Sequence, residues 1–240
     1  MTEDNVSIVT LINATKIYHM GYSEVRAVQN ISVAIKAGDY LAVVGHSGSG
    51  KSTLLRIIGA MELSTEGEVY LNGICTGAAK PQELTALRAK TVGFVFQDFR
   101  LLPQLTALEN VMVPLLPYLH EAGGQTGKRR SIPGESAAAR AKILLERVGL
   151  GERTRHKPAQ LSGGEQQRVA IARALVREPR LILADELTGN LDSQTRDQIM
   201  ELLDSLHREG LTVVVATHDQ GVMDHCRGQV KLQDGMIITH

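Results

Sequence analysis

A run of glycines followed by a lysine and a serine, at residues 45–52, has the spacing of a phosphate-binding loop. Such glycines let main-chain N–H groups turn inward around phosphate oxygens, and the N-terminus of a following helix adds partial positive charge. Lys51 would reach the β- and γ-phosphates, and the hydroxyl of Ser52 would bind Mg²⁺. The apolar strand pattern before the loop and the helical pattern after it favour this function over a simple turn. The candidate nucleotide-binding residues here are Gly45, His46, Ser47, Gly48, Ser49, Gly50, Lys51, Ser52 and Thr53.

Two carboxylates end a second apolar run. Leu181 to Ala184 has the pattern of a buried strand, and Asp185 and Glu186 follow it directly. Asp185 could hold Mg²⁺, directly or through water, and Glu186 could polarise an attacking water. Alone, such a pair would more often cap a helix. Beside a phosphate-binding loop it supplies the positioning and charge neutralisation that hydrolysis needs, so we predict catalysis.

A third motif opens a predicted helix at Leu161. Ser162 and Glu165 have the spacing of a capping box, in which each side chain bonds the other residue's main chain. Capping does not account for Gly163 and Gly164, which cost roughly 1 kcal/mol each in a helix. Bare backbone at a helix N-terminus is suited to close approach of a phosphate, so we assign residues 162–165 to nucleotide binding.

The segment Leu161 to Glu165 resembles the signature of ATP-binding cassette ATPases, and the resemblance covers essentially the whole chain. It implies that two copies close head to tail, with the phosphate-binding loop of one and the signature helix of the other enclosing each ATP. It also implies roles for four residues that would mean little singly. Tyr18 would stack on adenine, and Tyr22 is a nearby alternative for that role. Gln97 would link the two lobes, bind Mg²⁺ and take part in catalysis. His218 would be a catalytic switch near the γ-phosphate, and Asp192 would lie in a loop that crosses to the partner.

One residue departs from the family pattern. Leu187 follows the catalytic glutamate candidate, where the family usually has proline. Because both carboxylates are kept, we expect activity to survive, at a rate that depends on how rigidly the turn holds Glu186.

The order of predicted elements indicates an α/β protein. Ser7 to Ile35 has the pattern of an antiparallel layer of short strands, and Tyr40 to Val44 opens a phosphate-binding core whose sheet is mixed and mainly parallel. Residues from about 101 to 176 are predicted to be mostly helical. We therefore expect a single ATP-binding cassette over residues 1–240, with a core at 1–100 and 177–240 and an inserted helical subdomain between them.

Composition limits the remaining functions. The chain has 26 Lys plus Arg and 26 Asp plus Glu, which argues against a nucleic-acid partner. Cys75 and Cys226 show no metal-ligand spacing, and we expect two reduced thiols. No window has the ~18 uninterrupted apolar residues that spanning requires, and the N-terminus lacks the pattern of a secretion signal. Basic, glycine-rich residues 123–130 are predicted to form a solvated loop.

The predicted partners are a second copy of the chain and a transmembrane permease, with a cytoplasmic location on the inner face of the membrane. Strings such as Gly93 to Gln97 and Thr188 to Ser193 resemble bacterial cassettes for lipoprotein release and macrolide export. Cell-division and amino-acid-importer cassettes are alternatives. A cassette acting on nucleic acid or the ribosome would normally show a second cassette, a coiled coil or a basic surface, and a P-loop kinase would lack the signature.

Overall fold

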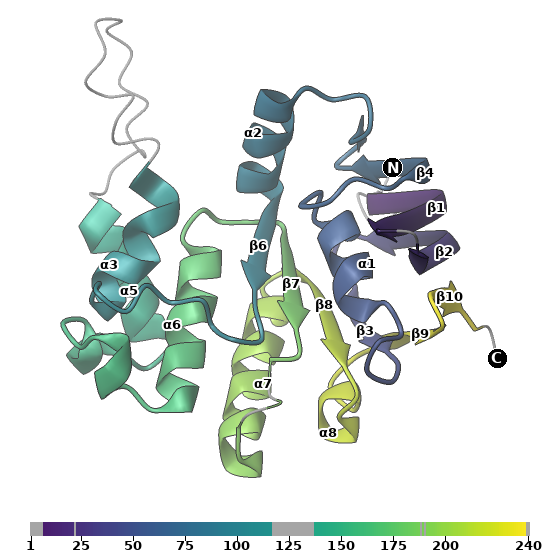
Figure 1. Ribbon diagram of the computed structural model, residues 1–240. Coiled ribbons are helices and arrows are strands. Elements are labelled where there is room, and N and C mark those ends of the chain that lie inside the picture. Colours follow the sequence, from purple (N-terminus) through teal and green to yellow (C-terminus); the bar gives the residue numbers. More distant parts are fainter. Residues whose placement is uncertain (1–6, 22, 117–136, 188, 190, 239–240) are drawn as a thin grey trace, which may run out of the picture.

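The computed structural model describes residues 7–21, 23–116, 137–187, 189 and 191–238, and its larger sheet has six strands in the order β10-β9-β3-β8-β7-β6. The strands from β9 to β6 are parallel, and β10 pairs antiparallel with β9. This confirms the predicted α/β fold with a mainly parallel sheet (Figure 1). The strands are β3 (Tyr40–Val44), β6 (Val92–Val95), β7 (Leu181–Asp185), β8 (Thr212–Thr217), β9 (Gly228–Gln233) and β10 (Met236–Ile237).

A second, antiparallel sheet has the order β2-β1-β4-β5. Its strands are β1 (Ser7–Met20), β2 (Ser23–Lys36), β4 (Glu66–Leu71) and β5 (Ile74–Cys75). The region from Ser7 to Ile35, expected to form several short strands, forms two strands of 14 residues each. Their pairing shifts register between Leu11 and Ala14, where Asn13 takes a φ of 50°, so a bulge bends the hairpin. The sheet meets the larger one where the N–H of Gln29 donates to the carbonyl of Gly235, at 2.8 Å.

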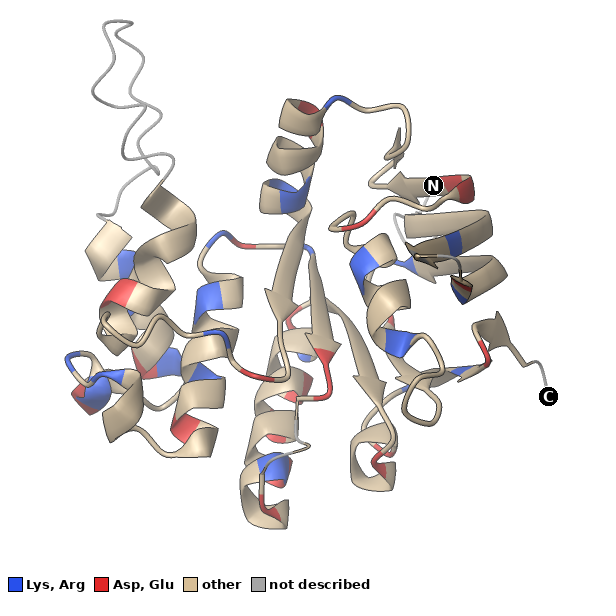
Figure 2. Ribbon diagram, in the orientation of Figure 1, with Lys and Arg blue, Asp and Glu red and all other residues tan. Residues whose placement is uncertain are grey.

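Helices cover both faces of the parallel sheet. On one face α1 (Lys51–Ile58) packs on alternate residues of β7 and β8, such as Leu183 and Val214. On the other face α6 (Gly163–Leu175) and α7 (Ser193–Arg208) pack on the intervening residues, such as Ile182 and Val215. The central strands are almost free of charged residues up to the carboxylate at the end of β7 (Figure 2). Two further helices are α2 (Pro81–Thr91), which the sequence analysis did not assign, and α8 (Gln220–Met223).

Residues 107–175 contain short helices with a buried cluster of their own, which includes Val111, Leu145 and Val169. The helices within the described ranges 107–116 and 137–175 are α3 (Ala107–Met112), η2 (Val113–Leu115), α5 (Ala137–Arg147), η3 (Gly151–Arg153), η4 (Pro158–Gln160) and α6. The predicted solvated loop at 123–130 lies outside the described residues, and the division into lobes near residues 100 and 177 stays a prediction. No helix in the described ranges is long and apolar enough to cross a membrane.

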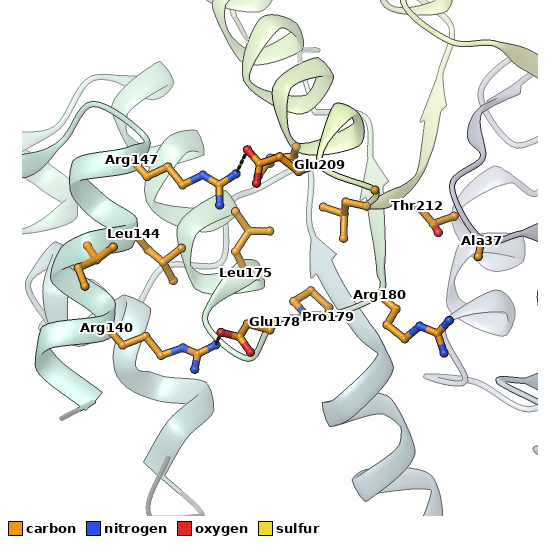
Figure 3. A pocket seen from close by; sticks show the side chains of 14 residues that line it. Ala37, Arg140, Leu144, Arg147, Leu175, Glu178, Pro179, Arg180, Glu209 and Thr212 are labelled. Carbon is orange, nitrogen blue, oxygen red and sulfur yellow. Dashed lines mark hydrogen bonds and ion pairs between the residues drawn. The ribbon is translucent and has the colours of Figure 1, made fainter. Parts of the chain in front are cut away.

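Two ion pairs join α5 to the loops that follow α6 and α7. Arg140 pairs with Glu178 at 2.7 Å, and Arg147 pairs with Glu209 (Figure 3). They flank a cavity of about 570 Å³, into which Leu175 also projects. The cavity lies between α5 and the N-terminal ends of β7 and β8, and none of the predicted site residues lines it.

Candidate functional site

The predicted phosphate-binding loop connects β3 to α1, and two of its glycines, Gly45 and Gly50, are required by close approach to neighbouring backbone. A Cβ at Gly45 would lie 2.5 Å from the carbonyl oxygen of Leu232, and one at Gly50 would lie 2.2 Å from that of Ala27. Gly50 also has a φ of 101°, which L side chains rarely adopt. The loop is therefore pressed between β9 and β2, where only glycine fits.

Lys51 is 5% exposed and is held by the loop itself. Its Nζ donates to the carbonyls of Gly45 at 2.9 Å and His46 at 3.1 Å. The same Nζ lies 3.4 Å from Oε1 of Glu186, at the end of β7. The structure thus brings the predicted phosphate-binding lysine and the predicted catalytic carboxylate into contact.

Two of the three candidate Mg²⁺ ligands, Ser52 and Asp185, also meet, and the role of Gln97 in binding Mg²⁺ stays a prediction. The hydroxyl of Ser52 donates to Oδ1 of Asp185 at 2.9 Å. Burial raises the pKa of Asp185, the bond from Ser52 opposes this shift, and the neighbouring Glu186 adds to it. Hydroxyl and carboxylate oxygens fit a hard cation such as Mg²⁺. The described residues contain no cluster of three His, Cys, Asp or Glu that could hold a metal ion.

Glu186 lies at a sharp turn. It has a φ of 45°, in the left-handed region, and its N–H donates to the carbonyl of Ala216 at 3.0 Å. Nδ1 of His218, which is mostly exposed, lies 3.5 Å from Oε1 of Glu186. Leu187 is only 2% exposed and packs in the cluster that contains Ile199 and Val215. Apolar burial therefore anchors the turn at the position where the family usually has proline.

A cavity of about 810 Å³, a volume suited to a nucleotide, is lined by Lys51, Ser52 and Glu186 but not by Asp185 or His218. Its walls also include Ser47, Gly48, Gly50, Thr53 and Gln97. Sequence reasoning missed the opposite wall, formed by Glu24 to Ala27 of β2 with Asp234 and Gly235. No sequence motif identifies these residues as part of the site. They reach the cavity wall only because the long strands pair and the two sheets contact each other.

Tyr18 is not among the residues that line this cavity. Its hydroxyl donates to a carboxylate oxygen of Glu62, and Lys16 lies 5.3 Å from its ring centroid. Burial and then the bond to Glu62 raise its pKa, while a hydrogen bond with Thr53 lowers it. Thr53 lies in the cavity wall, so Tyr18 is adjacent to the site, and its role in adenine stacking stays a prediction. Tyr22 lies outside the described residues.

The predicted capping box at the start of α6 is confirmed. Ser162 Oγ accepts from the N–H of Glu165 at 3.2 Å, and Glu165 Oε2 accepts from the N–H of Ser162 at 2.8 Å. Packing also explains one of the two glycines, since a Cβ at Gly164 would lie 2.3 Å from Cγ2 of Thr195. At Gly163 the nearest atom would be 3.4 Å away. Gly163 alone therefore stays without a packing explanation.

Asp192 caps α7 beside this motif, because its carboxylate accepts from the N–H and the hydroxyl of Thr195 at 2.9 and 2.7 Å. Residues 162–165 and Asp192 do not line the cavity around Lys51. Since α6 and α7 cover one face of the sheet and α1 the other, the structure assembles the predicted residues as two separate groups.

Comparisons with known proteins identify the family. The sequence model of a family described as ABC transporter matches residues 28–189. An ABC transporter ATP-binding protein of Thermotoga maritima is 45% identical over 96% of this chain and 93% of its own length. The macrolide export ATP-binding/permease protein MacB of Hyphomonas neptunium is 43% identical over 97% of this chain but 34% of its own length. A solved dimeric, post-hydrolysis structure of an ATP-binding cassette bound to ADP and Pi has 45% identity and a TM-score of 0.85, covering 96% of this chain and 97% of that one.

Proposed function

This chain belongs to the ABC transporter family and is an ATP-binding, ATP-hydrolysing cassette, and from that premise we propose that two copies pair around ATP to power a transmembrane permease. The observation that carries the proposal is the separation of the site into two groups. The phosphate-binding loop and Glu186 lie at one cavity, with Asp185 bonded to Ser52 in its wall, while Ser162, Gly163, Gly164, Glu165 and Asp192 lie elsewhere. A second copy would supply the missing group to each cavity, and a similar cassette has been solved as a dimer.

Within one chain, the phosphates of ATP would replace the present partners of Lys51. Its ammonium contacts Glu186 and two loop carbonyls, and in the ATP complex it would bind the phosphates instead. Glu186 is then free to accept a proton from the water that attacks the γ-phosphate, which gives ADP and phosphate. His218, close to Glu186, and Gln97 in the cavity wall would orient that water. Ser52 and Asp185 would hold Mg²⁺, which neutralises phosphate charge when bound.

A groove of about 290 Å³ beside Gln97 fits the permease contact. It lies along the exposed side of β6, and its walls include Phe94, Phe96, Arg100 and Arg177. The guanidinium of Arg100 lies 4.0 Å from the ring centroid of Phe96. Because the Gln97 to Arg100 segment joins the nucleotide cavity to this groove, closure around ATP would move both together.

The macrolide-export relatives favour mechanical transduction or export of the lipoprotein-release and macrolide-export kind, since each carries a permease with a similar cassette. The cell-division and importer alternatives stay open. The chain would then act on the cytoplasmic side, bound to the inner face of the membrane. The equal numbers of acidic and basic residues give no support to a nucleic-acid partner.

Affinity capture from detergent-solubilised membranes tests the partner. The tagged parent should retain a polytopic membrane protein, and Arg100→Glu should lose it while the isolated variant keeps its ATPase rate. Recovery of nucleic acid in place of a membrane protein would contradict the proposed partner. Equal capture of the membrane protein by the two chains would contradict the contact at this groove.

A further inference from the structure

Gln167 carries a buried amide with nothing to bond. It lies in α6, is 0% exposed, and neither Nε2 nor Oε1 has a hydrogen-bond partner within the described part of the chain. A buried polar group without partners is costly. Gln166, one residue earlier, donates its amide to the carbonyl of Leu161 at 3.1 Å. Asn110, equally buried, donates to three main-chain carbonyls and accepts one main-chain N–H.

Helical spacing places Gln167 on the face of α6 that also carries Gly164 and Ile171. Gly164 packs against Thr195, in the first turn of α7. Ile171 belongs to the buried cluster that contains Leu187. The neighbours of Gln167 on this face of α6 therefore pack against the chain that runs from the end of β7 into α7.

That turn has the groups an amide needs. The N–H and carbonyl of Glu186 already bond Ala216 and Gly189, whereas no hydrogen bond of the Leu187 main chain occurs within the described residues. Glu186 is held in a left-handed conformation at the same point.

We propose that Gln167 is a positioning residue that bonds the main chain of the Glu186–Leu187 turn once ATP has closed two copies. The inference rests on the proposed pairing. In such a pair, residues 162–165 of this chain contact the ATP bound in the partner's cavity, whereas Glu186 acts on the ATP in its own cavity. Gln167, one turn from Gly164, would transmit closure at one ATP to the catalytic carboxylate at the other.

The test compares Gln167→Met, which removes the amide but keeps the length of the side chain, with Gln166→Met, which removes an amide that already has a partner. Without nucleotide, Gln167→Met should melt at or above the parent's temperature, because an unpartnered polar group is lost. Gln166→Met should melt lower. With ATP, Gln167→Met should lose roughly tenfold in kcat, since one buried bond is missing in the closed state. KM should change little, and the Hill coefficient for ATP should fall toward one.

Each outcome decides the inference. A lower melting temperature for Gln167→Met would mean that the amide is bonded before ATP binds, which overturns the proposal whatever happens to kcat. An unchanged kcat and Hill coefficient would also overturn it. The underlying pairing is judged separately by the ATP-dependent mass of Glu186→Gln. If that variant pairs and Gln167→Met keeps full kcat, only the role of Gln167 fails.

Discussion

The contact between Gly164 and Thr195 can be tested by adding a single methyl group. In Gly164→Ala the new Cβ would lie 2.3 Å from Cγ2 of Thr195, far inside carbon contact distance. Thr195 cannot easily yield, because its hydroxyl and N–H both bond Asp192 at 2.7 and 2.9 Å and its χ1 is stiff. Gly163→Ala is the matched control, since its Cβ would meet only Leu191, at 3.4 Å.

Overpacking costs about 1–3 kcal/mol, and a separation of 2.3 Å places this contact in the upper part of that range, at about 2–3 kcal/mol. Replacing a helical glycine by alanine returns up to about 1 kcal/mol. The expected net loss for Gly164→Ala is therefore about 1–2 kcal/mol, or roughly 2–8 °C in Tm for a chain of this size. Thermal unfolding without nucleotide, followed by circular dichroism, measures it. Gly163→Ala should match or exceed the parent. Adding Thr195→Ser, which deletes Cγ2 but keeps the hydroxyl, should restore most of the Gly164→Ala loss. Parent-like melting of Gly164→Ala, or no recovery in the double variant, would refute the packing argument.

Three further predictions rest on other contacts. Asn110→Ala should lose about 2–4 kcal/mol of unfolding free energy, because it strips a buried amide from the main-chain groups it bonds; a loss below 1 kcal/mol in urea titration would contradict this. Burial, and then Asp204, raise the pKa of Cys226 to about 12, so iodoacetamide at pH 8 should alkylate Cys75 well before Cys226, as mass spectrometry would show; equal rates would contradict it. Main-chain and hydroxyl bonds from Thr106 hold the pKa of Glu109 below 4.5, so the parent's stability advantage over Glu109→Gln should be full above about pH 4.5 and vanish as the pH falls through the lowered pKa. A pH-independent difference would contradict that reading.

The sequence predicts the parts of the site that local chemistry specifies. A glycine loop after one apolar strand and carboxylates after another come together when both strands belong to one parallel sheet. Here β3 and β7 flank β8, and Lys51 and Glu186 lie 3.4 Å apart. The capping box at Ser162 and Glu165 is equally local, and it is present.

The remaining features either lack a strong local pattern or depend on contacts between distant segments. The bulge at Asn13 interrupts the alternation of β1, which is why the long hairpin reads as short strands. The helix α2 buries few apolar residues, among them Leu84 and Leu87, so its periodicity is weak. The need for glycine at position 164 arises from Thr195, a residue of another helix. None of these signals lies within a single sequence window.

The central claim, that two copies enclose ATP and that Glu186 hydrolyses it, is tested most directly by the mass of Glu186→Gln in solution with ATP and Mg²⁺, beside phosphate release by the parent chain. Light scattering should show a dimer that forms only with ATP in the variant, and only the parent should release phosphate. A variant that stays monomeric at saturating ATP, while the parent hydrolyses ATP, would contradict pairing of the isolated chain. Absence of nucleotide binding in both chains would contradict the site itself.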